Sequence, residues 1–131
     1  MADKALRVSV LGAWGPAIAW CLLIFWLSSM SNPPQILPPF ALQDKLLHGI
    51  EYGILAILLH RGLRRKGPAG SPSFYFALAL GMASVYAASD ETHQLFVPGR
   101  QADVWDWAAD TVGAYLALWV CTRRSFRAGP S

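Results

Sequence analysis

Charged residues and cysteines are scarce in this chain of 131 residues. Only 15% of the residues are charged, whereas 54% are hydrophobic, which is not the balance of an ordinary soluble domain. Cys21 and Cys121 both fall inside apolar segments. They are therefore typical of small buried side chains rather than of a disulfide or a metal site. The net charge is only +3, and we expect no nucleic-acid partner.

Four apolar segments are long enough, or nearly so, to cross a membrane as helices of about 20 residues. They run over residues 8–30, 44–60, 74–95 and 104–122, and the second is short and carries charge. The first is longer than the apolar part of a usual signal peptide, and no A-x-A site follows it, so we expect it to be retained. Irregular backbone is not tolerated in lipid. We therefore predict an all-α fold, a single-domain integral membrane bundle of four transmembrane helices over residues 1–131.

Basic residues gather at one end of the expected bundle. By the positive-inside rule, both termini and the middle loop (61–73) are then cytoplasmic, and the loops around Pro34 and Pro98 are extracytoplasmic. Only Lys45 and Arg100 lie at the other end. The residues on the cytoplasmic side are Lys4, Arg7, Arg61, Arg64, Arg65, Lys66, Arg123, Arg124 and Arg127.

Seven of the eight carboxylates lie at or just inside the extracytoplasmic ends of the segments. An acid in hydrocarbon costs about 3 kcal/mol by insertion scales, so a membrane protein that keeps several usually uses them. With about 100° between successive helical residues, three helices each present a polar stripe. The stripes are Asp44, His48 and Glu51; Asp90, His93 and Gln94 with Glu91 beside them; and Asp103, Asp106 and Asp110. These stripes predict a shared polar pocket that opens outward.

The chemistry of this pocket is left open by the spacing. Seven acids against Lys45 and Arg100 imply that some acids hold a proton or bind a cation. Arg100 could bridge the acids or contact an anionic headgroup. General acid–base catalysis by His48 with Asp106 or Glu51 is one alternative. Another is a polar network that only locks the helix ends, the preferred interpretation for the rim residues Asp44, Glu91 and Asp103.

A divalent metal site is a further alternative. Asp44 and His48 are spaced i, i+4, and Asp90 and His93 are spaced i, i+3, so each pair could direct two ligands at one ion. Against a metal, the sequence has no H-E-x-x-H motif. The cofactor is therefore left undecided.

Small residues and a turn indicate how the helices pack. Gly49 and Gly53 form a G-x-x-x-G, and Ala109, Gly113 and Ala117 continue this spacing in the last segment. Such residues let helices approach closely, inside the bundle or between copies of a homo-oligomer. The Val-Pro-Gly-Arg sequence at 97–100 predicts a tight turn that brings the third helix back to the fourth. The proline-rich loop at 31–43, with Ile36, Leu37 and Phe40, lies on the membrane surface, covers the site or is a plain connector.

Three groups of residues carry a resemblance to a known family. They are Asp44-Lys45 with His48 and Tyr52; the run D-E-T-H-Q-L-F-V-P-G-R from Asp90 to Arg100; and Asp106 followed by Gly113. The chain resembles the VanZ-like family of small bacterial integral membrane proteins, most strongly over residues 44–118. Asp110 departs from the pattern, because the family is expected to have Asn there, and a role that needs a neutral amide is therefore in doubt.

The resemblance implies a multi-pass protein of the bacterial cell (inner) membrane with a role in the cell envelope. The founding member of the family is associated with low-level resistance to the glycopeptide teicoplanin. No settled activity comes with the family name, and whether this protein is an enzyme is left open. A fold does not by itself give a function.

We therefore expect an outward-facing polar site that binds or modifies an envelope component, such as a lipid-linked or glycan headgroup. The expected partners are membrane lipids and an envelope precursor lipid or a glycopeptide-related ligand. The alternative is a non-enzymatic structural or partner-binding protein. The candidate catalytic residues are His48, Glu51, Asp90, Glu91 and Asp106, and the candidate substrate-binding residues are Asp44, Lys45, Tyr52, His93, Gln94, Arg100 and Asp110.

Overall fold

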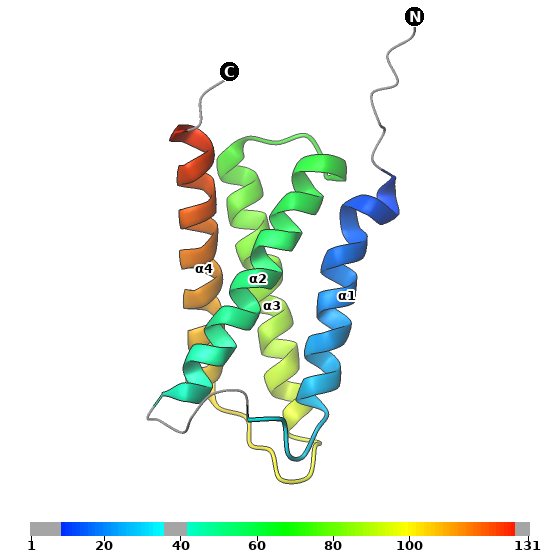
Figure 1. Cartoon of the computed structure of the whole chain (residues 1–131), viewed down its shortest axis with the longest axis vertical. Helices are drawn as coiled ribbons and strands as arrows, with labels where there is room; N and C mark the ends of the chain where they lie inside the picture. Colours follow the sequence, from blue (N-terminus) through cyan, green and yellow to red (C-terminus); the bar gives the residue numbers. More distant parts are fainter. Residues whose placement is uncertain (1–8, 36–41, 128–131) are drawn as a thin grey trace, which may run out of the picture.

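A computed structural model describes residues 9–35 and 42–127, the last three by their backbone only. Over these ranges the fold is all-α with four helices and no strand, as predicted. Figure 1 shows them as a bundle. The helices are α1 (Val10–Ser28), α2 (Gln43–Lys66), α3 (Pro72–Gln94) and α4 (Val104–Arg127). Several residues used above, including Lys4, Arg7, Ile36, Leu37 and Phe40, lie outside the described ranges.

The second helix is longer than the sequence indicated, and the expected loop at 61–73 is wrong in extent. α2 continues through the basic residues to Lys66, where the Gly67 amide donates to the Leu63 carbonyl over 2.8 Å. Two effects favour this extension. Leu63 is buried against the bundle, and basic side chains are favourable at the C-terminal end of a helix.

Four membrane crossings are not established by helix composition. Among the described helices only α1 is both long and apolar enough to qualify as a span, with a mean hydropathy of 1.9. α2, α3 and α4 have 24, 23 and 24 residues. At about 1.5 Å per residue each is long enough to cross a core of about 30 Å. Their charged and polar residues lower their hydropathy, so composition alone does not identify them as membrane spans.

α2 and α3 each contact all three other helices, and the contacts of α2 are the more extensive, whereas the described parts of α1 and α4 do not touch. The pair α2 and α4 is held at close range by glycines. A Cβ at Gly113 would overlap the backbone of Gly49, and a Cβ at Gly53 would lie 3.2 Å from that of Ala117. The predicted small-residue faces therefore pack inside the bundle. α1 joins through the indole of Trp20, which donates to the Glu51 carbonyl over 2.9 Å.

Figure 1 shows which helix ends lie together at each end of the bundle, and the charged residues of the sequence differ between the two ends. The start of α1, the α2–α3 connection and the end of α4 lie together at one end, which we call the basic end. The start of α2, the end of α3 and the start of α4 lie at the other, which we call the acidic end. The acidic end contains the candidate site.

Candidate functional site

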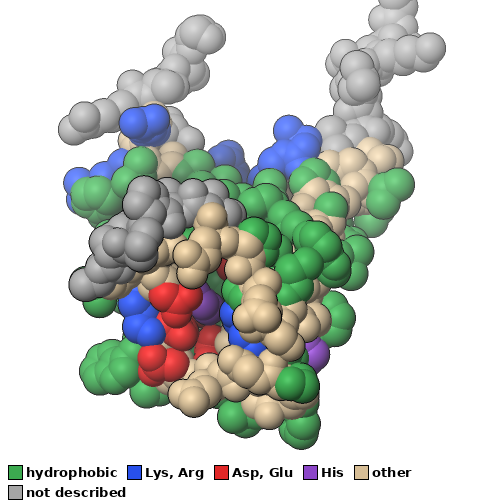
Figure 2. Space-filling model, turned by 60° about the horizontal axis from the view of Figure 1, so that its bottom comes forward, with side chains coloured by type: hydrophobic (Ala, Val, Ile, Leu, Met, Phe, Trp, Pro, Cys, Tyr) green, Lys and Arg blue, Asp and Glu red, His purple; other side chains and the backbone are tan. Residues whose placement is uncertain are grey.

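The interior of the acidic end is polar. Figure 2, which brings this end forward, shows Asp or Glu side chains and a His around a hollow, with Lys or Arg on either side. The buried members come from three helices, so the predicted convergence of α2, α3 and α4 is present in the structure. They are His48, Asp90, Glu91, Gln94, Asp106 and Asp110, each no more than 8% exposed.

Lys45 ties the start of α2 to the start of α4. Its Nζ donates to Asp103 Oδ2 over 2.7 Å and also contacts Asp106 Oδ1. The hydrogen bond from Lys45 holds the pKa of the Asp103 carboxyl below its usual range. The same side chain neutralises the buried Asp106. One of the two cations at this end is therefore already engaged by two acids.

His48 and Asp110 form a second link between α2 and α4, deeper in the bundle. His48 Nδ1 lies 3.0 Å from Asp110 Oδ1, and both side chains are buried. The second oxygen of Asp110 has no hydrogen-bond partner among the described residues. Asp110 thus places a carboxylate, with one oxygen to spare, at the most buried acidic position.

α3 contributes two adjacent acids with different surroundings. Glu91 Oε2 accepts a hydrogen bond of 2.9 Å from the Asp103 amide, which connects the end of α3 to the start of α4. Its other oxygen, Oε1, is buried and has no partner in the described part of the chain. Asp90 Oδ2 accepts a long hydrogen bond of 3.4 Å from Gln94, one turn further along the helix.

The turn that follows α3 is formed as predicted. The Arg100 amide donates to the Val97 carbonyl over 3.1 Å, and Gly99 has φ of +80°, a conformation that favours glycine. The Arg100 side chain then interacts electrostatically with the partly buried Glu51. Its Nε is buried without a partner among the described residues.

Within the described ranges, five of the six buried side-chain polar atoms that lack hydrogen bonds lie at this end, and the sixth, Arg61 Nη1, lies toward the basic end. The five are Ser28 Oγ, Tyr52 Oη, Glu91 Oε1, Arg100 Nε and Asp110 Oδ2. An unsatisfied buried polar group costs about 1–3 kcal/mol, and native proteins keep few of them. Their concentration at one end of the bundle is what a binding site, rather than a finished structural network, would produce.

One candidate residue, His93, lies apart from this cluster, and another, Asp44, lies at its edge. His93 faces α1, where its Nε2 is 3.0 Å from Ser29 Oγ and its ring is 4.7 Å from that of Phe25. Asp44 is exposed at the rim. The residue spacing predicts a polar stripe on α3 that is wide enough to face two neighbouring helices. Only the packing of the helices shows that His93 faces α1.

Two sets of three side chains could hold a metal ion, with one donor atom from each residue within 4.8 Å of the others. One is His48, Glu91 and Asp110, all buried. The other is Asp44, His48 and Asp106. The pairing of Asp90 with His93 is not among these sets, since His93 faces α1.

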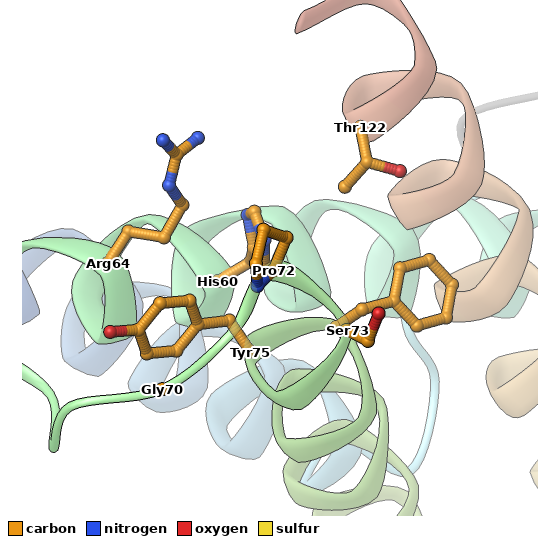
Figure 3. Close-up of a pocket in the computed structure, with 8 residues that line it drawn as sticks. His60, Arg64, Gly70, Pro72, Ser73, Tyr75 and Thr122 are labelled. Atoms are coloured by element: carbon orange, nitrogen blue, oxygen red, sulfur yellow. The ribbon is translucent and has the colours of Figure 1, made fainter. Parts of the chain in front are cut away.

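The basic end contains a pocket that the sequence did not indicate. It has a volume of about 500 Å³ and is lined by His60, Arg64, Ser73 and Thr122, among others (Figure 3). His60 is buried there. A single histidine in the sequence does not predict this pocket, because the pocket forms only where α2, α3 and α4 come together.

The comparisons with known proteins agree with the motif resemblance. No curated protein and no solved structure matches the chain. The family model described as VanZ/LLP1 matches residues 13–126, which include all four helices almost completely. The polar residues of the acidic end and the fold that gathers them lie inside this match, and the chain therefore belongs to the VanZ-like (VanZ/LLP1) family.

Proposed function

We propose that this protein is a multi-pass bacterial membrane protein whose acidic end binds the polar headgroup of an envelope lipid or lipid-linked glycan on the extracytoplasmic side. The observation that carries the proposal is the concentration of buried, unpartnered polar atoms at the acidic end. If the bound component is also chemically modified, His48 and the acids would carry out the proton transfers, because they are the side chains of this site that can exchange protons.

The distribution of apolar side chains supports a membrane setting. Large hydrophobic residues are exposed on the outer faces of all four helices, while ionisable residues are buried between them. A soluble bundle would expose the reverse, because a large exposed apolar surface is costly in water. Representative exposed residues are Leu22, Phe25, Ile50, Val85 and Leu116.

The charge distribution supports an outward-facing site. Apart from Lys45, the basic residues of α2 and α4 lie at the end opposite the acidic cluster. With the positive end in the cytoplasm, the cluster is at the depth of the outer headgroups. A headgroup ligand therefore needs no path through the bundle.

A groove on the surface suits the lipid part of such a ligand. It has a volume of about 770 Å³ and runs between α2 and α4 from Lys45 along an almost wholly apolar floor. The glycines that allow close α2–α4 packing leave it without side chains at its base. An acyl chain in this groove would place its headgroup beside Lys45, at the rim of the acidic cluster. Its lining includes Leu46, Ile50, Gly53, Val112, Gly113 and Leu116.

Within the cluster the residues have distinct roles in this proposal. Arg100 contacts the anionic part of the headgroup through its free Nε. Tyr52, Glu91 and Asp110 have the spare oxygen atoms to bond hydroxyl groups of a glycan. Asp44 and His93 are left out, because one is exposed and the other faces α1.

Lipid retention by the purified chain tests the proposal. Native mass spectrometry of the full chain, purified gently from a bacterial membrane, is expected to find a bound envelope lipid. Arg100→Gln and His48→Ala are expected to lose that lipid at unchanged yield and helicity. Arg64→Gln, the same exchange at the basic end, serves as the control and should retain it. Equal lipid on all four proteins would refute headgroup binding at the acidic end.

A structural role is the second candidate, and specific contacts favour it. Lys45 with Asp103 and Asp106, His48 with Asp110, and Glu91 with the Asp103 amide together connect three helices. If this network only stabilises the bundle, His48→Ala and Asp106→Ala lower the amount of folded protein, and any envelope phenotype, including teicoplanin susceptibility, follows that amount. A phenotype lost at full abundance would instead favour the ligand site.

A further inference from the structure

We propose that His48, Glu91 and Asp110 form a binding site for one divalent transition-metal ion. The inference concerns the same end of the bundle as the proposed headgroup site and assigns the spare oxygens of Glu91 and Asp110 to an ion instead of to glycan hydroxyls, but it does not depend on headgroup binding. The three ligands come one each from α2, α3 and α4. The spacing of residues along the chain did not predict this set.

The geometry places three donors around one point. A ring nitrogen of His48 and one carboxylate oxygen each from Glu91 and Asp110 lie within 4.8 Å of one another. Ligand atoms at about 2.1 Å from a common ion are separated by about 3–3.5 Å. A shortening of the longest edge of the triangle by at most about 1.3–1.8 Å, through rotation of the side chains, would therefore complete the site.

The bonding of these side chains points to a missing partner. Asp110 is 1% and Glu91 is 7% exposed, yet Asp110 Oδ2 and Glu91 Oε1 have no hydrogen-bond partner among the described residues. Each other oxygen is already bonded, Asp110 Oδ1 to His48 and Glu91 Oε2 to the Asp103 amide. Both carboxylates are thus oriented by one contact and leave the second oxygen for a cation.

Local charge favours a dication. Lys45 is engaged by Asp103 and Asp106, so it does not offset the triad or Asp90. A protonated His48 would neutralise only one of the buried acids. Paired charges or a metal ion are the usual ways of keeping several buried carboxylates. One dication bound by two carboxylates and a neutral imidazole has no net excess.

The donor set selects the class of ion. Imidazole suits Zn²⁺ and Fe²⁺, and carboxylates suit Mn²⁺ and Mg²⁺, so a mixed set fits Zn²⁺ or Mn²⁺ better than Mg²⁺. Three protein ligands leave at least one position for water or a ligand, as in catalytic zinc sites.

The overlapping set of Asp44, His48 and Asp106 is a weaker candidate. Asp106 is already paired with Lys45, and Asp44 is exposed at the rim. A cation there would have to displace the ammonium group of Lys45. Asp44→Asn therefore removes one acid from the competing set without touching the proposed one.

Metal binding by the purified full chain tests the inference. After chelator treatment, titration with Zn²⁺ or Mn²⁺ alone is expected to give one tightly bound ion per chain, with Mg²⁺ at least about tenfold weaker. Glu91→Gln and Asp110→Asn are expected to weaken binding at least about tenfold. Asp44→Asn, with the same loss of one charge, should bind as the wild type does.

Several outcomes would overturn the proposal. They are no saturable Zn²⁺ or Mn²⁺ binding by the wild type, a preference for Mg²⁺, and a loss caused by Asp44→Asn as large as that caused by Asp110→Asn. If the two triad variants do not fold, X-ray absorption of the wild-type zinc complex decides the matter. Imidazole and oxygen ligands support the site, whereas a sulfur ligand from a cysteine rejects it. Since no lipid enters these measurements, their failure leaves the headgroup proposal to its own test.

Discussion

At the scale of single residues, the buried polar groups that have hydrogen-bond partners differ in meaning from those that lack them. The first kind indicates a structural network, and the second kind indicates a ligand site. Lys45, Asp103 and Asp106 satisfy one another at the rim, as a structural network should. Tyr52 and Asp110, deeper in the bundle, keep a buried polar atom without a partner in the described chain. A protein gains nothing in stability from such atoms, so a ligand is the better explanation for them.

Tyrosine-to-phenylalanine exchange separates stability from binding. Tyr52→Phe removes a buried hydroxyl that has no partner, so the free energy of unfolding should stay level or rise by up to about 1 kcal/mol. Lipid retention should nevertheless fall. The measurements are thermal unfolding of the purified chain and native mass spectrometry.

Tyr86→Phe is the matched control for this exchange. The Tyr86 hydroxyl donates to the Cys21 carbonyl over 2.7 Å, so its removal should cost about 1 kcal/mol of stability without loss of bound lipid. A Tyr52→Phe protein that is markedly destabilised and still binds lipid would contradict the assignment of Tyr52 to the site.

At the scale of helices, the close packing of α2 against α4 brings together the polar residues of the acidic end. The close approach of the two helices aligns Lys45 with Asp103 and Asp106, and His48 with Asp110. The glycine positions were visible in the sequence as a G-x-x-x-G. The sequence did not show which two helices these glycines would join. The spacing of small residues marks a packing face on one helix but does not identify the helix that packs against it.

Two alanine substitutions test this close packing. Gly113→Ala inserts a methyl group into the backbone of Gly49, which should lower the free energy of unfolding by about 1–3 kcal/mol. Gly81→Ala is the control, since nothing lies within 4 Å of its added Cβ, and it should be neutral or gain up to about 1 kcal/mol from helix propensity. Circular dichroism melting in detergent measures both. Equal melting temperatures would show that α2 and α4 are not in close contact there.

At the scale of the whole molecule, the bundle reverses the usual distribution of polarity. Apolar side chains face outward along the helices, and the acidic ones converge at one end (Figure 2). The VanZ-like family match fits this arrangement. The orientation in the membrane is the part of the proposal that places the site in contact with envelope components.

Labelling of single added cysteines measures that orientation. The two substitutions are Gln101→Cys, in the exposed connection before α4, and Ala69→Cys, in the exposed connection between α2 and α3. In intact cells a membrane-impermeant maleimide should label the first, whereas the second should react only after permeabilisation. The chain without either added cysteine gives the background from Cys21 and Cys121. The opposite labelling pattern would place the acidic end in the cytoplasm and remove the headgroup proposal.

The sequence by itself determined the helices, the polar residues on them and the turn at Val97–Arg100, because these depend on local spacing and on backbone preferences. It also carried the motifs of the family. It misplaced the end of α2, where burial of Leu63 continues the helix through its basic residues.

Only the tertiary structure decided which polar groups meet. Packing turned His93 toward Ser29 and Phe25 on α1 and brought Glu91 beside His48 and Asp110. These contacts depend on how three helices cross, and a helical stripe about 60° wide is compatible with more than one neighbour. The closeness of donor atoms in space, and the absence of partners for some of them, therefore could not be obtained from the order of residues along the chain.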